Sequence, residues 1–109
     1  MSGFDEVIHA PHRLRITARL AQVDSMEFGA LRDDLQVADS VLSKQLKVLT
    51  DAGYVTLDKP TGKGRVKTWA RLTPAGRRAF AGHVAALQTL VSVDPSPAAP
   101  SGRTRPDRR

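Results

Sequence analysis

With 109 residues, 40% of them hydrophobic, and a formal net charge of +6, the chain is expected to fold as one basic domain with one modest core. It has no cysteine, which excludes a disulfide framework and a thiolate metal site, and it has no apolar run long enough to span a bilayer. The first residues, MSGFDEV, lack the apolar segment of a secretory signal, so we expect a cytoplasmic protein that does not bind membranes.

Positive charge is concentrated in one part of the sequence. Residues 40–72 contain seven lysines and arginines against two acids, a net charge of +5, whereas residues 1–39 contain four against seven, a net charge of −3. A basic segment of this kind indicates a polyanionic partner. Composition alone leaves open the alternative of a generically basic surface that serves solubility.

The first 27 residues predict two short helices and a turn. Pro11 suits the first turn of a helix, and HRLRITARLAQV (residues 12–23) repeats its apolar residues at the helical period of 3.6. DSME (residues 24–27) is expected as a turn or a very short extended piece. The helix ahead of Pro11 has one apolar patch, which consists of Phe4, Val7 and Ile8.

Residues 28–52 predict two helices joined by a tight turn, which is the helix-turn-helix pattern. The first helix ends near Gln36, and Asp39 or Ser40 is expected to cap the second, over about residues 40–52. Gly53 is placed to end this second helix in the left-handed conformation. Its buried stripe is predicted to be Leu42, Leu46 and Leu49, with Ser40, Ser43, Lys44 and Lys47 on the opposite face.

Two alternating segments, YVTLDK (54–59) and VKTWARL (66–72), predict a β-hairpin with PTGKGR as its loop. Trp69 is expected to pack at the base of this hairpin. The loop does not match a nucleotide-binding phosphate loop, because Leu57 stands where that motif needs its first glycine and Gly64 stands where it needs Ser or Thr. A strand, not a helix, is also expected to follow it.

Thr73 and Pro74 predict the start of a last helix, as a capping hydroxyl and a first-turn proline. No Lys, Arg, Asp or Glu occurs between Arg78 and Val93, so this helix needs apolar cover on more than one side. We therefore divide the chain into a folded domain at 1–92 and a disordered tail, rich in Pro, Ala and Arg, at 93–109.

The segment LQVADSVLSKQLKVLTDAGYVTLDKP, followed by the hairpin and LTPAGRRA, resembles winged helix-turn-helix transcriptional regulators of the MarR and ArsR kind, in their short single-domain form. HAPHRLRITARL also resembles the start of such regulators, and the resemblance covers about residues 5–91. It implies a mainly α fold with a small antiparallel β-hairpin wing. It also implies a homodimer that binds double-stranded DNA, as a repressor on a pseudo-palindromic operator. The residues themselves predict no catalytic site and no cofactor.

The basic segment and the helix-turn-helix context predict the residues that contact DNA. On the recognition helix these are Asp39, Ser40, Ser43, Lys44, Gln45 and Lys47, and on the wing they are Lys63, Arg65 and Lys67. The alternatives are an ordinary solvated helix face and a polar hairpin tip. The resemblance and the uncharged last helix predict a dimer interface formed by Phe4, Val7, Ile8, Phe80, Val84, Leu87 and Val91.

Three other functions compete with DNA binding. A winged helix can serve as a protein–protein interaction module, but such a module needs no basic wing. No residue constellation predicts an enzyme or a metal site, and the three histidines, His9, His12 and His83, are expected at the surface or at an interface. RNA binding is disfavoured because few aromatic residues are available for stacking. The sequence identifies no small-molecule effector.

Overall fold

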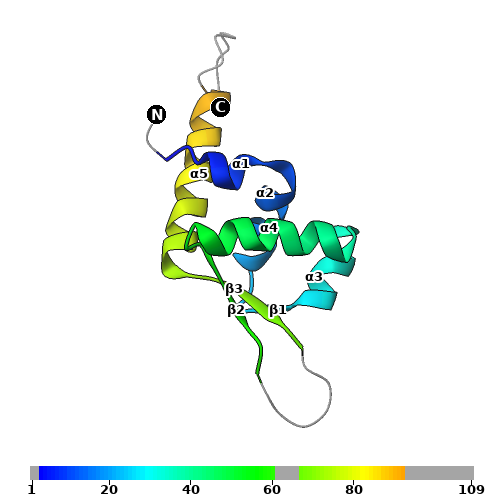
Figure 1. Cartoon of the computed structure of the whole chain (residues 1–109). Helices are drawn as coiled ribbons and strands as arrows, with labels where there is room; N and C mark the ends of the chain where they lie inside the picture. Colours follow the sequence, from blue (N-terminus) through cyan, green and yellow to red (C-terminus); the bar gives the residue numbers. More distant parts are fainter. Residues whose placement is uncertain (1–2, 61–66, 93–109) are drawn as a thin grey trace, which may run out of the picture.

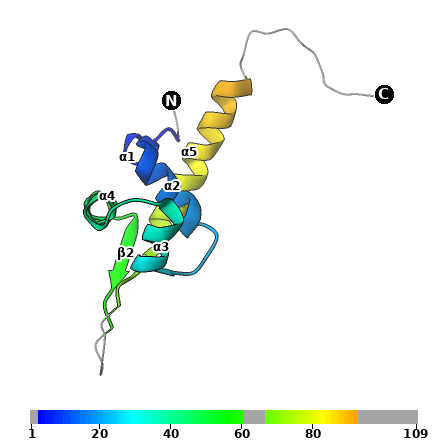
Figure 2. The same cartoon turned by 90° about the vertical axis from the view of Figure 1, so that its right-hand side faces the viewer.

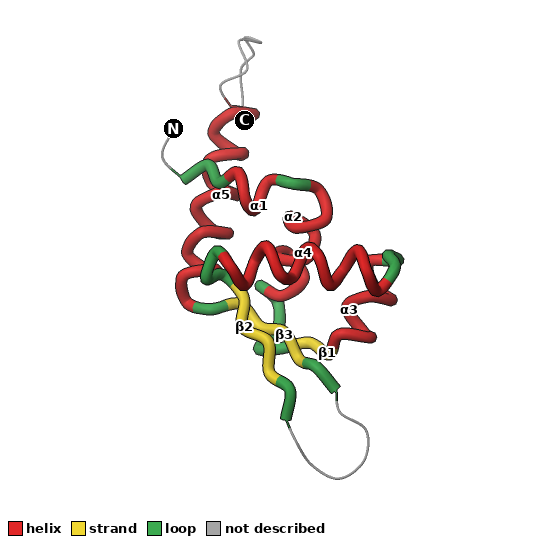
Figure 3. The backbone as a smooth tube through the Cα atoms, in the orientation of Figure 1, coloured by secondary structure: helices red, strands yellow, loops and turns green. Residues whose placement is uncertain are grey.

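The computed structural model describes residues 3–60 and 67–92, and it confirms the mainly helical fold with a small antiparallel sheet. In Figure 3 the strands lie together below most of the helices, and the last helix runs along one side. The elements follow in the order α1 (Glu6–His9), α2 (Pro11–Leu20), β1 (Met26–Glu27), α3 (Phe28–Leu35), α4 (Asp39–Asp51), β2 (Val55–Asp58), β3 (Trp69–Leu72) and α5 (Pro74–Ser92) (Figure 1).

The sheet has three strands in the order β1-β3-β2. It therefore contains one strand more than the two-stranded hairpin that the sequence predicts. The extra strand comes from the segment expected as a turn or a very short extended piece, where Met26 pairs with Ala70. Since side chains alternate along a strand, Ala70 and Leu72 are buried while Trp69 lies on the outer face with 38% of its surface exposed. Trp69 therefore contributes less packing at the base of the hairpin than its size suggests.

One hydrophobic core joins the helix-turn-helix to the sheet. The stripe predicted for the recognition helix is confirmed, because its three leucines are 0–1% exposed. They pack with residues of α2, α3 and the two hairpin strands, so burial of this apolar surface fixes α4 against the rest of the domain. The cluster consists of Ile16, Leu20, Leu31, Leu35, Leu42, Leu46, Leu49, Val55, Ala70 and Leu72.

Of the two predicted ends of α4, the C-terminal one is confirmed and the N-terminal one is wrong. Gly53 has φ 81° and donates to the carbonyl of Thr50, while the N–H of Tyr54 donates to the carbonyl of Leu49, so the predicted left-handed stop is confirmed as a Schellman motif. The predicted side-chain cap is wrong. The helix begins at Asp39, its N-cap is Ala38 without a side-chain hydrogen bond, and the Asp39 carboxylate bonds to Arg32 instead.

Thr73 attaches the start of α5 to the end of α4. Its hydroxyl accepts from the N–H of Gly76 at 2.9 Å, which confirms the predicted cap, and donates to the carbonyl of Gly53 at 2.7 Å. The N–H of Thr73 also donates to the carbonyl of Tyr54 at 2.9 Å. These bonds fix the position of the last helix relative to the recognition helix.

Candidate nucleic-acid interface

The outer face of α4 is the most exposed polar surface of the helix-turn-helix. Figure 2 shows α4 at the outer edge of the molecule, with α5 on the other side and the hairpin extending downwards. Because the leucine stripe points into the core, the helix presents short hydroxyls and lysines to solvent. Five of the six residues predicted to contact DNA are exposed there: Asp39, Ser40, Ser43, Lys44 and Lys47.

Two of these exposed charges are already paired within the chain. The Asp39 carboxylate accepts from Arg32 at 2.9 Å, and hydrogen bonds to Asp39 and Asp33 raise the pKa of Arg32. Lys47 lies 3.2 Å from the Asp51 carboxylate, one turn further along α4. Exposed pairs of this kind contribute little to stability, so a phosphate can compete for Lys47. Lys44 forms no salt bridge within the described residues, and it is the cation most available on this face.

Gln45, the sixth predicted residue, is half-buried and is directed towards α2. Arg13 donates from Nη1 to the Gln45 amide oxygen at 2.8 Å and from Nε to the carbonyl of Val7 at 2.5 Å. The bond from Arg13 holds the Gln45 amide on the side of α4 that faces α2, away from the exposed outer face. This bond joins α4 to α1 and α2. The sequence prediction missed Arg13, because no local pattern links positions 32 residues apart.

A groove of about 310 Å³ is lined by residues of α3, of α4 and of the hairpin. Its lining combines three apolar side chains with two ammonium groups and three hydroxyls, and these polar groups are suited to the sugar-phosphate backbone of a nucleic acid. Lys59, which was not among the predicted DNA contacts, contributes one of these ammonium groups. The groove is lined by Phe28, Ser43, Leu46, Lys47, Thr50, Leu57, Lys59 and Thr68.

Of the predicted wing residues, Lys67 is exposed just ahead of β3. Lys63 and Arg65 lie outside the described residues. Within the described residues, the prediction that the wing contacts DNA is therefore supported by Lys59 and Lys67, which lie exposed at the two sides of the hairpin.

The predicted dimer surface needs one correction. Ile8 is 0% exposed within its own chain, because α1 packs against α2, α4 and α5, so it has no surface to offer a second copy. Phe4, Val7, Phe80, Val84 and Leu87 are half-buried. Val91 and its neighbour Leu90 are 75% and 47% exposed. An apolar strip therefore remains accessible along α5.

His83 also differs from its prediction, since it is fully buried within its own chain instead of lying at the surface or at an interface. His9 and His12 are exposed, as expected. Within residues 3–60 and 67–92, no three histidine or acidic side chains are grouped so as to hold a metal ion. None of the helices in those ranges is both long enough and apolar enough to cross a bilayer.

Comparisons with known proteins match this arrangement. A family model described as a winged helix DNA-binding domain matches residues 12–91. The chain is 36% identical over 84 residues to the uncharacterized protein MJ0432 of Methanocaldococcus jannaschii, in a match that covers 77% of this chain and 87% of that protein.

Solved structures of regulators have the same fold. The transcriptional regulator homologue protein from Pyrococcus horikoshii OT3 superposes with a TM-score of 0.77 over 81% of this chain and 87% of that one, at 20% identity. A protein described as "Possible transcriptional regulator for arsenical resistance" gives a TM-score of 0.58 over 78% and 80% of the two chains, at 30% identity. The zinc-responsive MarR family member ZitR of Lactococcus lactis gives a TM-score of 0.53 over 71% and 52%, at 22% identity.

Proposed function

This chain belongs to the winged helix DNA-binding domain family of transcriptional regulators and has a MarR-like fold. We propose that it forms a homodimer, binds double-stranded DNA and represses transcription. The observation that carries the proposal is the outer face of α4. Ser40, Ser43 and Lys44 are exposed on a helix whose opposite face is buried in the core. A helix held in this way can enter the major groove without rearranging the domain.

Sequence discrimination is assigned to α4, and general affinity is assigned to the basic groove and the hairpin. The hydroxyls of Ser40 and Ser43 can hydrogen-bond to base edges, and Lys44 can donate to guanine or to a phosphate. Lys59 and Lys67 lie at the two sides of the hairpin, where they can neutralise backbone phosphates. Lys63 and Arg65 are proposed to extend the same contact. Binding should therefore weaken as the salt concentration rises.

A two-fold dimer would place two α4 helices about one turn of DNA apart, roughly 34 Å, so the target should be a pseudo-palindrome. Selection from random duplexes tests this directly. The expected product is an inverted repeat with half-site centres about ten base pairs apart. Recovery of unrelated sequences without a shared motif would contradict specific recognition. A dimer bound over a promoter would block transcription, and a reporter carrying the selected repeat tests that step.

Leu87→Glu is expected to convert the dimer into a monomer. Leu87 lies half-buried in the apolar strip of α5, and a carboxylate there would be desolvated without a partner if a second copy covered the strip. Sedimentation should then give the mass of a single chain. Thr89→Glu is the matched control, because the exposed Thr89 points away from the strip and should leave the dimer intact. An unchanged dimer in the Leu87 variant would place the interface elsewhere.

A further inference from the structure

Asp5, just ahead of α1, connects the last helix with the end of the recognition helix. Its N–H donates to Nδ1 of His83 on α5 at 3.0 Å, and its carboxylate accepts from the hydroxyl of Tyr54 at 2.5 Å. The other carboxylate oxygen caps α1 by accepting from the N–H of Ile8 at 3.1 Å. Tyr54 is the residue that completes the Schellman motif of α4. Asp5 therefore joins the start of α1 to α5 and to the turn that follows α4, both of which lie far from it in the sequence.

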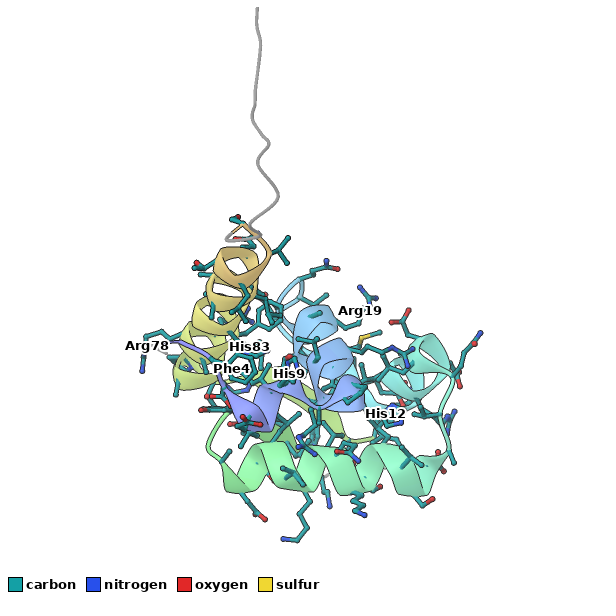
Figure 4. All side chains as sticks on the ribbon, turned by 90° about the horizontal axis from the view of Figure 1, so that it is seen from above. Phe4, His9, His12, Arg19, Arg78 and His83 are labelled. Carbon is teal, nitrogen blue, oxygen red and sulfur yellow. The ribbon has the colours of Figure 1, made fainter. Side chains whose placement is uncertain are left out.

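These contacts determine the protonation state of His83. Nδ1 accepts the Asp5 N–H, so it carries no proton, and a neutral ring must then be protonated at Nε2. Nε2 lies 3.2 Å from Nδ1 of His9, which can accept that proton in a hydrogen bond. Figure 4 places Phe4, His9 and His83 together, with His12 apart from them. The Phe4 ring lies 4.8 Å from the His83 ring and 4.9 Å from the His9 ring, centroid to centroid.

The surroundings of His83 favour its neutral form. Burial lowers the pKa of His83, and the neighbouring His9 lowers it further, while the negative charges of Asp5 and Glu6 oppose both effects. The hydrogen bond to Asp5, together with burial, raises the pKa of Tyr54, so this hydroxyl remains a donor. The N-terminal segment is also pressed against α5, since a Cβ on Gly3 would lie 2.7 Å from the carbonyl oxygen of Gly82.

We propose that Asp5 is a positioning residue for DNA binding, which holds the end of α4 in place relative to α5 through Tyr54 and His83, and that this link persists only while His83 is neutral. A second proton on His83 would occupy Nδ1 and face the Asp5 N–H, so that two donors would oppose each other. Asp5 would then move away from His83, and the Tyr54 hydroxyl would lose the Asp5 carboxylate as its hydrogen-bond acceptor. The inference rests on the proposed function, because its consequence is measured as affinity for DNA.

The sign of the pH effect separates this mechanism from simple charge attraction. The pKa of His83 is lower in the folded chain than the ordinary value near 6.5, so the link is fully present above about pH 6.5 and weakens as the pH falls. Acidification makes a protein more positive as a whole, which by itself would strengthen its binding to DNA. A loss of affinity on acidification therefore indicates the Asp5 link.

The test measures affinity for the selected duplex at pH 7.5 and pH 5.5, at constant ionic strength. The affinity of the wild type should be lower at pH 5.5 by up to about tenfold. The reason is that one pH unit below 6.5 shifts the equilibrium between the intact and the broken Asp5–His83 hydrogen bond by about that factor. His83→Asn retains an acceptor near the position of Nδ1 but does not titrate, so it should show no loss. His83→Gln places its amide near Nε2, leaves the Asp5 N–H without an acceptor, and should bind weakly at both pH values. His12→Asn should retain the wild-type loss.

A second measurement does not depend on DNA. Protection of the Asp5 amide from hydrogen exchange, corrected for the intrinsic rate at each pH, should fall between pH 7.5 and pH 5.5 in the wild type but not in His83→Asn. Equal protection at both pH values in the wild type, or a DNA affinity that is flat or rises on acidification, would overturn the inference. Failure of the wild type to select any duplex at pH 7.5 would instead overturn the proposed function, and the exchange measurement would still decide the link.

Discussion

Gly76→Ala is expected to lower the free energy of unfolding by about 3 kcal/mol or more. A Cβ at this position would lie 2.1 Å from the carbonyl oxygen of Tyr54 and 2.9 Å from its carbonyl carbon. That oxygen cannot move freely, because it accepts the N–H of Thr73 at 2.9 Å. The first turn of α5 must therefore move away from the end of α4, which breaks the contact that fixes the two helices.

Gly82→Ala is the matched control for this effect. Gly82 lies in the same helix, but its added Cβ would meet the Gly3 backbone at 3.6 Å, which is an ordinary contact. Since alanine is favoured over glycine inside a helix, this variant should change stability by less than about 1 kcal/mol, in the stabilising direction. Urea denaturation followed by far-UV circular dichroism measures both. Equal stabilities of the two variants would show that α5 does not press on Tyr54.

Lys44→Glu is expected to weaken binding to the selected duplex by about 10- to 100-fold without changing the fold. Lys44 is exposed at the centre of the outer face of α4, so the substitution removes a donor to DNA and introduces repulsion with phosphates. Circular dichroism should remain that of the wild type. The measurement is a titration of labelled duplex followed by fluorescence anisotropy.

Arg78→Glu makes the same change in net charge at a different place. Arg78 is exposed on α5, apart from α4 (Figure 4). Its effect should be limited to a few-fold weakening through long-range electrostatics, which rising salt removes. Sedimentation should give the same mass for both variants. An equal loss of affinity in the two would mean that α4 is not the contact surface and that total charge alone drives binding.

The sequence could predict those features that depend on neighbouring residues. The leucine stripe of α4, the left-handed Gly53 and the cap at Thr73 each depend on residues within two turns of the chain, and all three are confirmed. The predicted N-cap of α4 is wrong because the Asp39 carboxylate pairs with Arg32 of the preceding helix. This tertiary contact replaces the hydrogen bond to a backbone N–H that a capping side chain would accept.

Other features depend on contacts between distant parts of the chain. A very short extended piece at β1 is among the expectations from the sequence, but its partner Ala70 is more than forty positions away, so no local periodicity could indicate the pairing. His83 is buried because Phe4, Asp5 and His9 cover it, and Gln45 is drawn towards α2 by Arg13. A one-dimensional helical pattern places Gln45 near the outer face of α4, but it contains no information about which neighbour competes for the amide.

The most direct measurement is a titration of the wild-type chain against the selected inverted repeat and a scrambled duplex of equal length, at three salt concentrations. Affinity for the repeat should be at least about a thousandfold tighter, and both affinities should fall linearly on a log–log plot against salt. Such a result requires base recognition together with phosphate contacts, which the proposed function assigns to α4 and to the hairpin. Equal and weak affinities for the two duplexes at every salt concentration would contradict the proposed function.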